Sequence, residues 1–410
     1  MGFTRLKREH LLHLRAATEV HWDGWSKEKN ETLQLHTVLS ILPITPNIRL
    51  LSLRYADINE PQQVVIFGLS TLRTLVVRSC CFHLSTNPMP HTYVTALKLA
   101  CNDVQTTRHL LNVLASTVED LEVDPSDRTV SGFLLGGLIE LPKVSTFTTT
   151  YCPGFAACRG SFGTLKRYAS ITTLHILFHL NLSDMSLHHL DLLALRSLTC
   201  HHRLAVNLVP KRPVTTYVEV DFELEEEPRR LLDSLSKTHA GITNLKLFVC
   251  DNFYSLLPSF ATSLQHLEQL TLRLCSPKWG YLLPNGARRY SNLPVRGLRK
   301  LSRQPLHSHP GVGAVALPNL RWVTFCIDEN QCTGFSPERF LKDYLLPVSP
   351  MLEEFECLYF AVPSHRFPLY QLPEPARAWK VRRLPDGSWE RRGPPPIPIP
   401  TPAKTLRAAR

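Results

Sequence analysis

Apolar residues recur along the chain at a fixed spacing, which residues 72–82 (LRTLVVRSCCF) show most clearly. The apolar positions there are Leu72, Leu75, Val77, Cys80 and Phe82. Because Leu75 and Val77 are two residues apart, both point to the same side of a β-strand, and the residues between them point to the other side. The stretch therefore predicts a strand with one buried and one outward face.

The same spacing recurs about a dozen times. Most successive copies begin 19–28 residues apart, and a weaker strand is expected earlier, through Ala17, Val20 and Trp22. One gap of 53 residues, between Leu267 and Leu320, predicts a long loop rather than a lost copy. The copies begin at Ile48, Leu72, Val94, Val118, Val144, Ile171, Leu195, Val214, Ile242, Leu267, Leu320 and Leu352.

This pattern, L-x-x-L-x-L-x-x-N/C-x-L at a period of 20–29 residues, is typical of leucine-rich repeats. A single repeat cannot bury its apolar face, so neighbouring repeats must stack. The predicted fold is an α/β repeat, a curved leucine-rich-repeat solenoid with parallel strands on the concave face and helices or irregular returns outside.

The ninth position of the pattern supports the alignment. It is occupied by Cys80, Asn102, Cys152, Cys250 and Cys275 in five of the repeats. Where the chain turns out of a strand, a small buried polar side chain can hydrogen-bond to backbone groups that the turn leaves unpaired.

Several segments between the strands predict helices. The clearest is 103–116, in which Asp103 is a good N-cap and Leu110, Leu111 and Leu114 share one face. In 336–346, Ser336 is the expected cap and Pro337 stands at the first helical position. Further helices are expected within 31–42, 226–237 and 252–264.

The end of the chain differs from the repeats. Residues 376–392 alternate like two strands around Pro385-Asp386-Gly387-Ser388, which predicts a hairpin with Trp379 and Trp389 covering the last repeat. The predicted organisation is an N-terminal cap (1–30), leucine-rich repeats (31–275), a basic Pro-rich insertion loop (276–316), terminal repeats (317–360), a C-terminal hairpin cap (361–392) and a disordered Pro-rich basic tail (393–410).

The net charge of +11 is concentrated in two segments. Residues 276–316 hold seven Lys/Arg and no acid, and residues 376–410 hold nine Lys/Arg against two acids, so each segment carries +7 and the rest of the chain −3. Such basic segments can attract nucleic acid or acidic partners, although they are also common as solvated loops.

Composition narrows the class of protein further. The chain has eleven cysteines, most at repeat positions, and a charged N-terminus (MGFTRLKREH) without a signal peptide, so we expect reduced thiols in a cytoplasmic or nuclear protein. No stretch of eighteen uninterrupted apolar residues occurs, and no membrane span is expected.

No catalytic, cofactor-binding or metal-binding motif stands out. His188-His189 and Cys200-His201-His202 resemble a metal cluster at first sight, but their spacing matches no standard zinc pattern and Cys200 fills a core position of its repeat. We therefore expect no cofactor, no metal site and no enzymatic activity.

The outward positions of the strands are the candidate binding surface. Their charges are of mixed sign, which argues against a continuous groove for phosphates and suits a folded protein or peptide partner. The candidate partner-binding residues are Arg54, Arg78, Lys98, Asp120, Glu122, Asp124, His175, Lys246 and Arg273, with Glu356 at the last repeat.

Four segments resemble the irregular leucine-rich-repeat proteins of the F-box type, especially the large fungal group. They are LPITPNIRLLSL, LSTLRTLVVRSCCF, LQHLEQLTLRLC and LPNLRWVTF, and the resemblance covers roughly residues 30–360. It implies that the repeats present substrates to a ubiquitin ligase of the SCF type, whose adaptor Skp1 docks on an N-terminal F-box. The first 22 residues do not show that box.

The sequence therefore predicts a non-enzymatic protein–protein interaction scaffold. The finer expectation, from the resemblance, is a substrate-recognition subunit of a ubiquitin ligase with Skp1 as a partner. The alternative is a nucleic-acid-associated protein that binds through the basic insertion and tail.

Overall fold

The computed structural model divides the chain into two compact units, Met1–Ser197 and Leu198–Arg410. These are called the N-terminal and the C-terminal unit. The structure describes residues 16–24, 35, 38–40, 42–45, 47–84, 89–124, 140–149, 170–177, 192–219, 228–249, 260, 263–274, 317–328, 337–360, 375 and 377–392.

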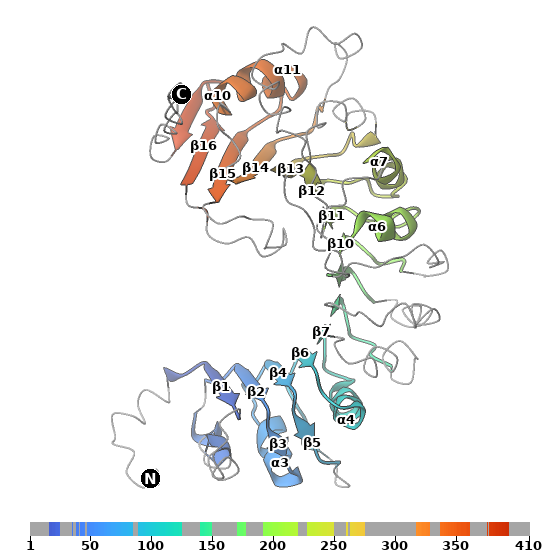
Figure 1. The fold of residues 1–410 in the computed structure, drawn as a ribbon, viewed down its shortest axis with the longest axis vertical. Coiled ribbons are helices and arrows are strands. Elements are labelled where there is room, and N and C mark those ends of the chain that lie inside the picture. The colour runs from blue at the N-terminus through green and yellow to red at the C-terminus, as the bar shows by residue number, and fades with distance from the viewer. Residues whose placement is uncertain are drawn as a thin grey trace, which may run out of the picture. The chain divides into compact units, whose positions relative to one another are not determined.

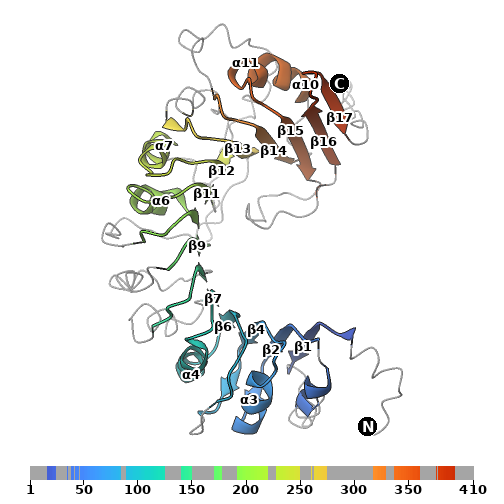
Figure 2. The same ribbon diagram turned by 180° about the vertical axis from the view of Figure 1, so that it is seen from behind.

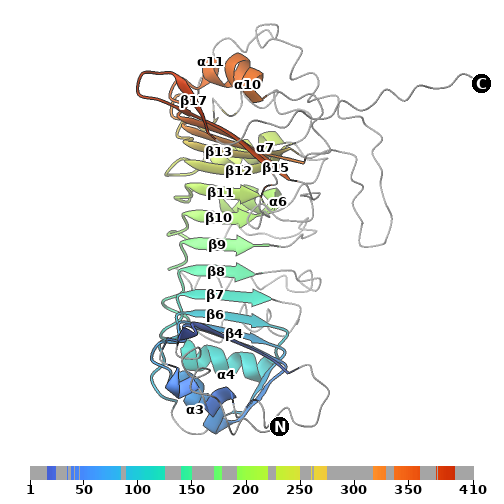
Figure 3. The ribbon, with the colours of Figure 1, turned by 90° about the vertical axis from the view of Figure 1, so that its left-hand side faces the viewer.

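The N-terminal unit is a stack of parallel strands, which Figure 3 shows side by side. Each strand pairs with the corresponding strand of the next repeat, so that Leu51, Leu75, Leu97 and Leu121 are direct neighbours. The strands, in spatial order, are β1 (Glu19–Asp23), β2 (Leu50–Arg54), β4 (Thr74–Arg78), β6 (Ala96–Ala100), β7 (Asp120–Asp124), β8 (Thr146–Thr149) and β9 (Thr173–Ile176).

The burial of alternate side chains confirms which positions of these strands were predicted to face the core. In β4, Leu75 and Val77 are buried, whereas Thr74 and Val76 are partly exposed and Arg78 is exposed. The first position of every repeat from Ile48 to Leu352 is at most 1% exposed. The weaker strand expected near Val20 is present as β1, which pairs in parallel with β2.

The chain leaves the first repeats through the same turn each time. The residue after β2, β4 and β6 (Tyr55, Ser79 and Cys101) has a positive φ of 51–53°. This left-handed residue redirects the chain, so that the next residue points inward. Two short segments that follow, β3 (Asp57–Ile58) and β5 (Cys81–Phe82), form a second parallel ladder.

The ninth position has the predicted role in the two described repeats that carry Cys or Asn there. The Asn102 side chain accepts a hydrogen bond from the Cys80 backbone N–H (2.9 Å) and donates one to the Val77 carbonyl (2.9 Å). The Cys80 sulfur in turn accepts from the Ala56 backbone N–H at 3.4 Å. Cys152, Cys250 and Cys275 lie outside the described residues.

Helices lie along one side of the N-terminal strands (Figures 1 and 2). The predicted helix after β6 is α4 (Val104–Leu114), with Asp103 as N-cap and with Leu110, Leu111 and Leu114 buried. A second helix, α3 (Glu60–Phe67), follows β3 and begins at an Asn59–Gln62 capping box. A short 3₁₀ turn, η1 (Leu42–Ile44), precedes β2.

The C-terminal unit repeats the arrangement with longer strands toward its end. β10 begins at the boundary between the units, and β13 pairs directly with β14 although 47 residues separate them in sequence, as the long-loop prediction requires. The strands are β10 (Ser197–Cys200), β11 (Thr216–Glu219), β12 (Asn244–Val249), β13 (Gln269–Leu274), β14 (Trp322–Asp328) and β15 (Glu354–Phe360), all parallel.

Two helical segments of this unit were predicted from the sequence. They are α7 (Pro228–Ser236) and the helical run that starts at Pro337. This run comprises α10 (Pro337–Phe340), one π turn η7 (Leu341–Leu345) and α11 (Leu346–Val348). A further helix, α6 (His202–Leu208), begins directly after β10. No described helix combines the length and hydropathy that a membrane span needs.

The predicted hairpin is present after β15. β16 (Arg377–Arg383) pairs antiparallel with β15, and β17 (Trp389–Arg392) pairs antiparallel with β16. Gly387 has a φ of +83° in the turn. Trp379 is buried and its ring stacks edge-on against Phe355, at 5.6 Å between centroids, so the hairpin covers the core of the last repeat.

These features establish the α/β repeat fold of a leucine-rich-repeat solenoid. The expected insertion 276–316 and tail 393–410 lie outside the described residues, as does most of the helix expected in 252–264.

Candidate interaction surface

The outward side chains of the N-terminal strands form one regular array, called the N-terminal open face. It lies opposite the buried leucines, because strand residues alternate between the two sides. The strand register joins its central row across the repeats. This row consists of His21, Ser52, Val76, Lys98, Glu122, Thr148 and His175.

Three predicted residues meet at the centre of this face. The Lys98 ammonium lies 2.7 Å from the Glu122 carboxylate, and these side chains are 45% and 33% exposed. Asp120 lies on the same strand as Glu122 and on the same side. Partial burial, together with the charge of Glu122, raises the pKa of Asp120, although Lys98 opposes the shift. A positive charge from a partner would therefore stabilise the ionised carboxylates of this cluster.

His175 stands at the other end of the same row. Burial lowers the pKa of its imidazole, although Asp120 and Glu122 favour the charged form. Thr148 lies between Glu122 and His175 in the register. The side chains of Thr148 and His175 therefore offer a partner hydrogen-bonding groups rather than a strong charge.

Two predicted arginines lie at the ends of neighbouring strands. Arg54 and Arg78 are register partners, and Arg54 forms a 3.3 Å ion pair with Asp23. The Arg54 guanidinium also lies 5.0 Å from the centre of the Tyr55 ring. Asp124 ends β7 in register with Ala100, and its side chain lies outside the described part.

The C-terminal open face is made of the outward residues of β12–β16. Lys246 and Glu356, both singled out in the sequence, lie in one of its two rows and are partly exposed. The register places the two rows as Asn244, Gln269, Trp322, Glu354 and Arg382, and as Lys246, Thr271, Thr324, Glu356 and Lys380.

Trp322 is the aromatic centre of this face. It is partly exposed, while the next residue, Val323, is buried. The Arg321 guanidinium lies 6.0 Å from the centre of the Trp322 ring and pairs with the Glu353 carboxylate at 3.4 Å. Tryptophan and arginine are both among the residues enriched at protein–protein hot spots.

A second ion pair flanks the tryptophan. The Lys380 ammonium lies 2.5 Å from the carboxylate of Glu354, which is the register neighbour of Trp322. Partial burial and the charge of Glu354 raise the pKa of Glu356, against the effect of Lys380. Acidic and basic groups thus alternate around one aromatic side chain.

Arg273 corrects the sequence analysis. We expected it to point outward from β13, but its side chain is fully buried. Cys326, its register partner on β14, is buried as well. The alternation of buried and outward residues stops after Leu272, where the strands of this unit become longer, so the expectation of an exposed arginine is wrong.

The sequence analysis missed Trp322, Glu354 and Lys380. It selected mainly the outward residue between the two leucines of each repeat, whereas Trp322 and Glu354 precede the first of these leucines. The segment LPNLRWVTF could have identified Trp322, because its alignment to the repeat pattern places Val323 inward and Trp322 outward. Lys380 reaches the face only through the antiparallel pairing of β16, which local patterns do not specify.

Cys200, His201 and His202, three of the residues considered for a metal cluster, lie in the described part. Cys200 is fully buried, and burial raises the pKa of its thiol well above the usual value. The His202 imidazole lies 3.3 Å from the Glu219 carboxylate. His188 and His189 lie outside the described residues. One other group in the described part brings three metal-ligating side chains together: Asp57, Cys81 and His83.

No protein-family profile and no curated protein sequence matches the chain. Among solved structures, it is similar to the leucine-rich-repeat-containing protein LegL7 from Legionella pneumophila. The two sequences are 11% identical, with a TM-score of 0.39, over 80% of this chain and 89% of that chain.

Proposed function

We propose that the protein is a non-enzymatic scaffold that binds a partner protein through the outward residues of its parallel strands. Within each unit the repeats supply an ordered array, because the inner strands are hydrogen-bonded to a neighbour on both sides. Recognition then depends on the side chains that the array presents.

One observation carries this proposal: a partly exposed tryptophan, Trp322, is surrounded by two ion pairs on an otherwise polar sheet face. Tryptophan and arginine dominate binding energy at interfaces, and surrounding polar contacts exclude water from them. The mixed charges favour a folded protein partner, because a nucleic acid would require a surface of one sign.

The test begins with co-purification from native cells and continues with an affinity measurement on the partner recovered. Trp322→Ala should weaken binding at least tenfold, as expected for a hot-spot aromatic residue. Tyr93→Ala is the matched control, because Tyr93 is 45% exposed but lies outside the strands. Unchanged affinity in Trp322→Ala, Lys98→Ala and Glu356→Ala alike would reject the proposed surface.

The finer proposal is a substrate-recognition subunit of an SCF-type ubiquitin ligase. It rests on the resemblance of the repeat segments to F-box proteins. Its test is whether Skp1 and a cullin co-purify with the full chain. Recovery of a partner without either would remove the ligase role and leave the scaffold role intact.

The alternative function is nucleic-acid binding through the basic segments 276–316 and 376–410, which each carry +7. In that case the logarithm of the affinity should fall steeply with the logarithm of salt concentration. Deletion of 276–316 together with 393–410, which leaves the β16–β17 hairpin in place, should weaken the binding and reduce its dependence on salt. If deletion leaves nucleic-acid binding unchanged, or if no binding occurs, this alternative fails.

A further inference from the structure

Three consecutive repeats place metal-ligating residue types at one equivalent position. Asp57, Cys81 and Asp103 each stand three residues after the last residue of β2, β4 and β6. Asp57 and Cys81 are direct partners in the β3–β5 ladder. His83 follows two residues after Cys81, on the same side of the chain. The turn that these three repeats share therefore gathers these side chains at one edge of the N-terminal unit.

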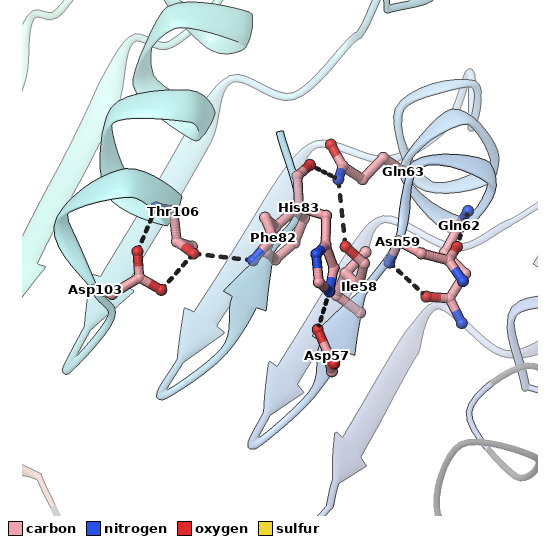
Figure 4. A network of polar contacts seen from close by, with 9 residues as sticks. All are labelled: Asp57, Ile58, Asn59, Gln62, Gln63, Phe82, His83, Asp103 and Thr106. Carbon is pink, nitrogen blue, oxygen red and sulfur yellow. Dashed lines mark hydrogen bonds and ion pairs between the residues drawn. The ribbon is translucent and has the colours of Figure 1, made fainter. Parts of the chain in front are cut away.

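The distances within this cluster are short. The His83 Nε2 atom lies 2.6 Å from an Asp57 carboxylate oxygen, as Figure 4 shows. The Cys81 sulfur, the His83 ring nitrogen and the Asp57 carboxylate oxygen all lie within 4.8 Å of one another. The side chains of His83 and Asp57 are 56% and 70% exposed, and Cys81 is an exposed free thiol. A solvated ion can therefore reach all three.

The backbone that carries two of these residues is well anchored. The Cys81 N–H donates to the Ala56 carbonyl at 2.9 Å, and the His83 N–H donates to the Ile58 carbonyl at 3.0 Å. The Gln63 amide donates to the His83 carbonyl at 2.6 Å (Figure 4). The positions of Cys81 and His83 are thus fixed before any ligand binds, which lowers the entropic cost of binding.

We propose that Cys81, His83 and Asp57 form a binding site for one Zn²⁺ ion, with Sγ, Nε2 and a carboxylate oxygen as ligands. A thiolate, an imidazole and a carboxylate are the three ligand types that zinc accepts together. Calcium and magnesium are disfavoured because they require oxygen ligands. Three protein ligands leave a fourth coordination position open for water or a bound group.

The geometry requires only a small adjustment. Ligand atoms at about 2.0 Å from a tetrahedral ion are about 3.3 Å apart. The His83–Asp57 pair must therefore open from 2.6 Å by less than 1 Å. The sulfur already lies within 4.8 Å of both other ligand atoms, and rotation of these exposed side chains can supply the remaining adjustment.

The surroundings of the site favour a cation. The Asp103 carboxylate accepts hydrogen bonds from the Thr106 N–H and hydroxyl (Figure 4). Asp103 and Cys81 line the same groove. Asp57 and Asp103 place two carboxylates around the Cys81 side chain, and a bound divalent ion would offset this concentration of negative charge. The groove is further lined by His83, Phe82, Leu84, Val104 and Gln105.

The experiment uses the full chain, stripped of metal and kept reduced. Co²⁺ serves as a spectroscopic probe for zinc, because thiolate ligation produces a charge-transfer band in the near ultraviolet. We expect one equivalent of Co²⁺ to produce this band and one equivalent of Zn²⁺ to displace it. Calorimetry then gives the Zn²⁺ affinity of each variant.

The variants locate the site among eleven cysteines. Cys81→Ser should remove the band, and His83→Ala and Asp57→Asn should each weaken Zn²⁺ binding at least tenfold, as the loss of a ligand does. Cys101→Ser is the matched control, because Cys101 is also exposed and lies in the next turn. It should keep both the band and the affinity. Circular dichroism of each variant checks that the fold is retained.

Two results would overturn the proposal. The first is a wild-type protein with neither a cobalt band nor measurable zinc binding. The second is a folded Cys81→Ser variant with unchanged stoichiometry and affinity, because the metal would then bind at other cysteines. A rise in melting temperature with Zn²⁺ that is lost in Cys81→Ser would support the site independently.

Discussion

Leu97 and Lys98 are neighbours in β6 with opposite roles. Leu97 is fully buried, whereas the Lys98 side chain is 45% exposed. Leu97→Ala should therefore lower the free energy of unfolding by about 2–5 kcal/mol, since it leaves a cavity. Lys98→Ala should lower it by less than about 0.5 kcal/mol, because an exposed ion pair contributes little. Urea unfolding of both variants is the measurement, and equal midpoints would contradict the strand phase.

Asn102 satisfies two buried backbone groups at once, the Cys80 N–H and the Val77 carbonyl. Asn102→Ala leaves both without this partner, so we expect a loss of about 2–6 kcal/mol, at about 1–3 kcal/mol for each of the two buried groups. Asn102→Asp keeps the acceptor but buries a carboxylate against the Val77 carbonyl, so at neutral pH it should be destabilising as well. A denaturant midpoint of Asn102→Ala equal to that of the wild type would argue against this role of the side chain.

Asp120 should make stability depend on pH. Its folded-state pKa is raised, so the folded protein binds this proton more tightly than the unfolded chain does, and ionisation destabilises the fold. Asp120→Asn should therefore be more stable than wild type at neutral pH, by about 0.5 kcal/mol or less. The difference should shrink as pH falls through the carboxyl pKa. Unfolding of wild type and Asp120→Asn measured from pH 3 to 7 is the test, and a stability difference that does not change with pH would contradict this role of Asp120.

Residue patterns predicted the buried leucines and the Cys80/Asn102 position because both follow from spacing along one chain segment. The outward residues were predicted less completely. Arg273 is buried and Trp322 is presented outward, and both outcomes depend on the length of strands that are far apart in sequence. The Asp57–His83 contact joins residues 26 positions apart, one repeat plus two residues. Aligning the repeats by the turns that follow the strands, rather than by the strands themselves, would have predicted this contact.

At the scale of the element, helices were predictable where a cap and an apolar face coincide. Asp103 marks the start of α4, and the buried leucines of this helix lie on one side. α3 was not singled out, because its segment EPQQVVIF buries two glutamines among its core residues and lacks a clear apolar face. Tertiary contacts such as the 2.6 Å His109–Gln63 hydrogen bond hold it instead. The π turn in Leu341–Leu345 has no signal in local sequence.

The capping box of α3 gives a test at this scale. The Asn59 side chain accepts from the Gln62 N–H at 3.1 Å, and the Gln62 side chain accepts from the Asn59 N–H at 2.8 Å. Asn59→Ala removes the first of these bonds and should cost about 1 kcal/mol. Ser70→Ala, at an exposed position after the helix, should cost less than about 0.5 kcal/mol. Thermal unfolding compares them, and equal losses would mean that the box does not stabilise α3.

At the scale of the molecule, the repeat pattern predicts one continuous array, whereas the chain divides into two compact units at Ser197–Leu198. The anchors Ile171, Leu195 and Val214 continue through this boundary and are fully buried. Repeat spacing specifies which strands are neighbours, but it carries no information on how densely each part of the chain is packed. This division therefore could not be read from the pattern.

The division has a measurable consequence, because stability in a repeat protein is a sum over neighbouring interfaces. A cavity at Leu97 should weaken β4, β6 and β7, which contact it, and should leave β12–β15 of the other unit protected. By hydrogen exchange, amides of β4–β7 should open at least about 30-fold more often in Leu97→Ala, the equivalent of about 2 kcal/mol. Leu245→Ala, at the equivalent position of β12, should show the reciprocal pattern. If either substitution accelerates exchange equally in both units, the two units unfold as one cooperative body and the division has no energetic meaning.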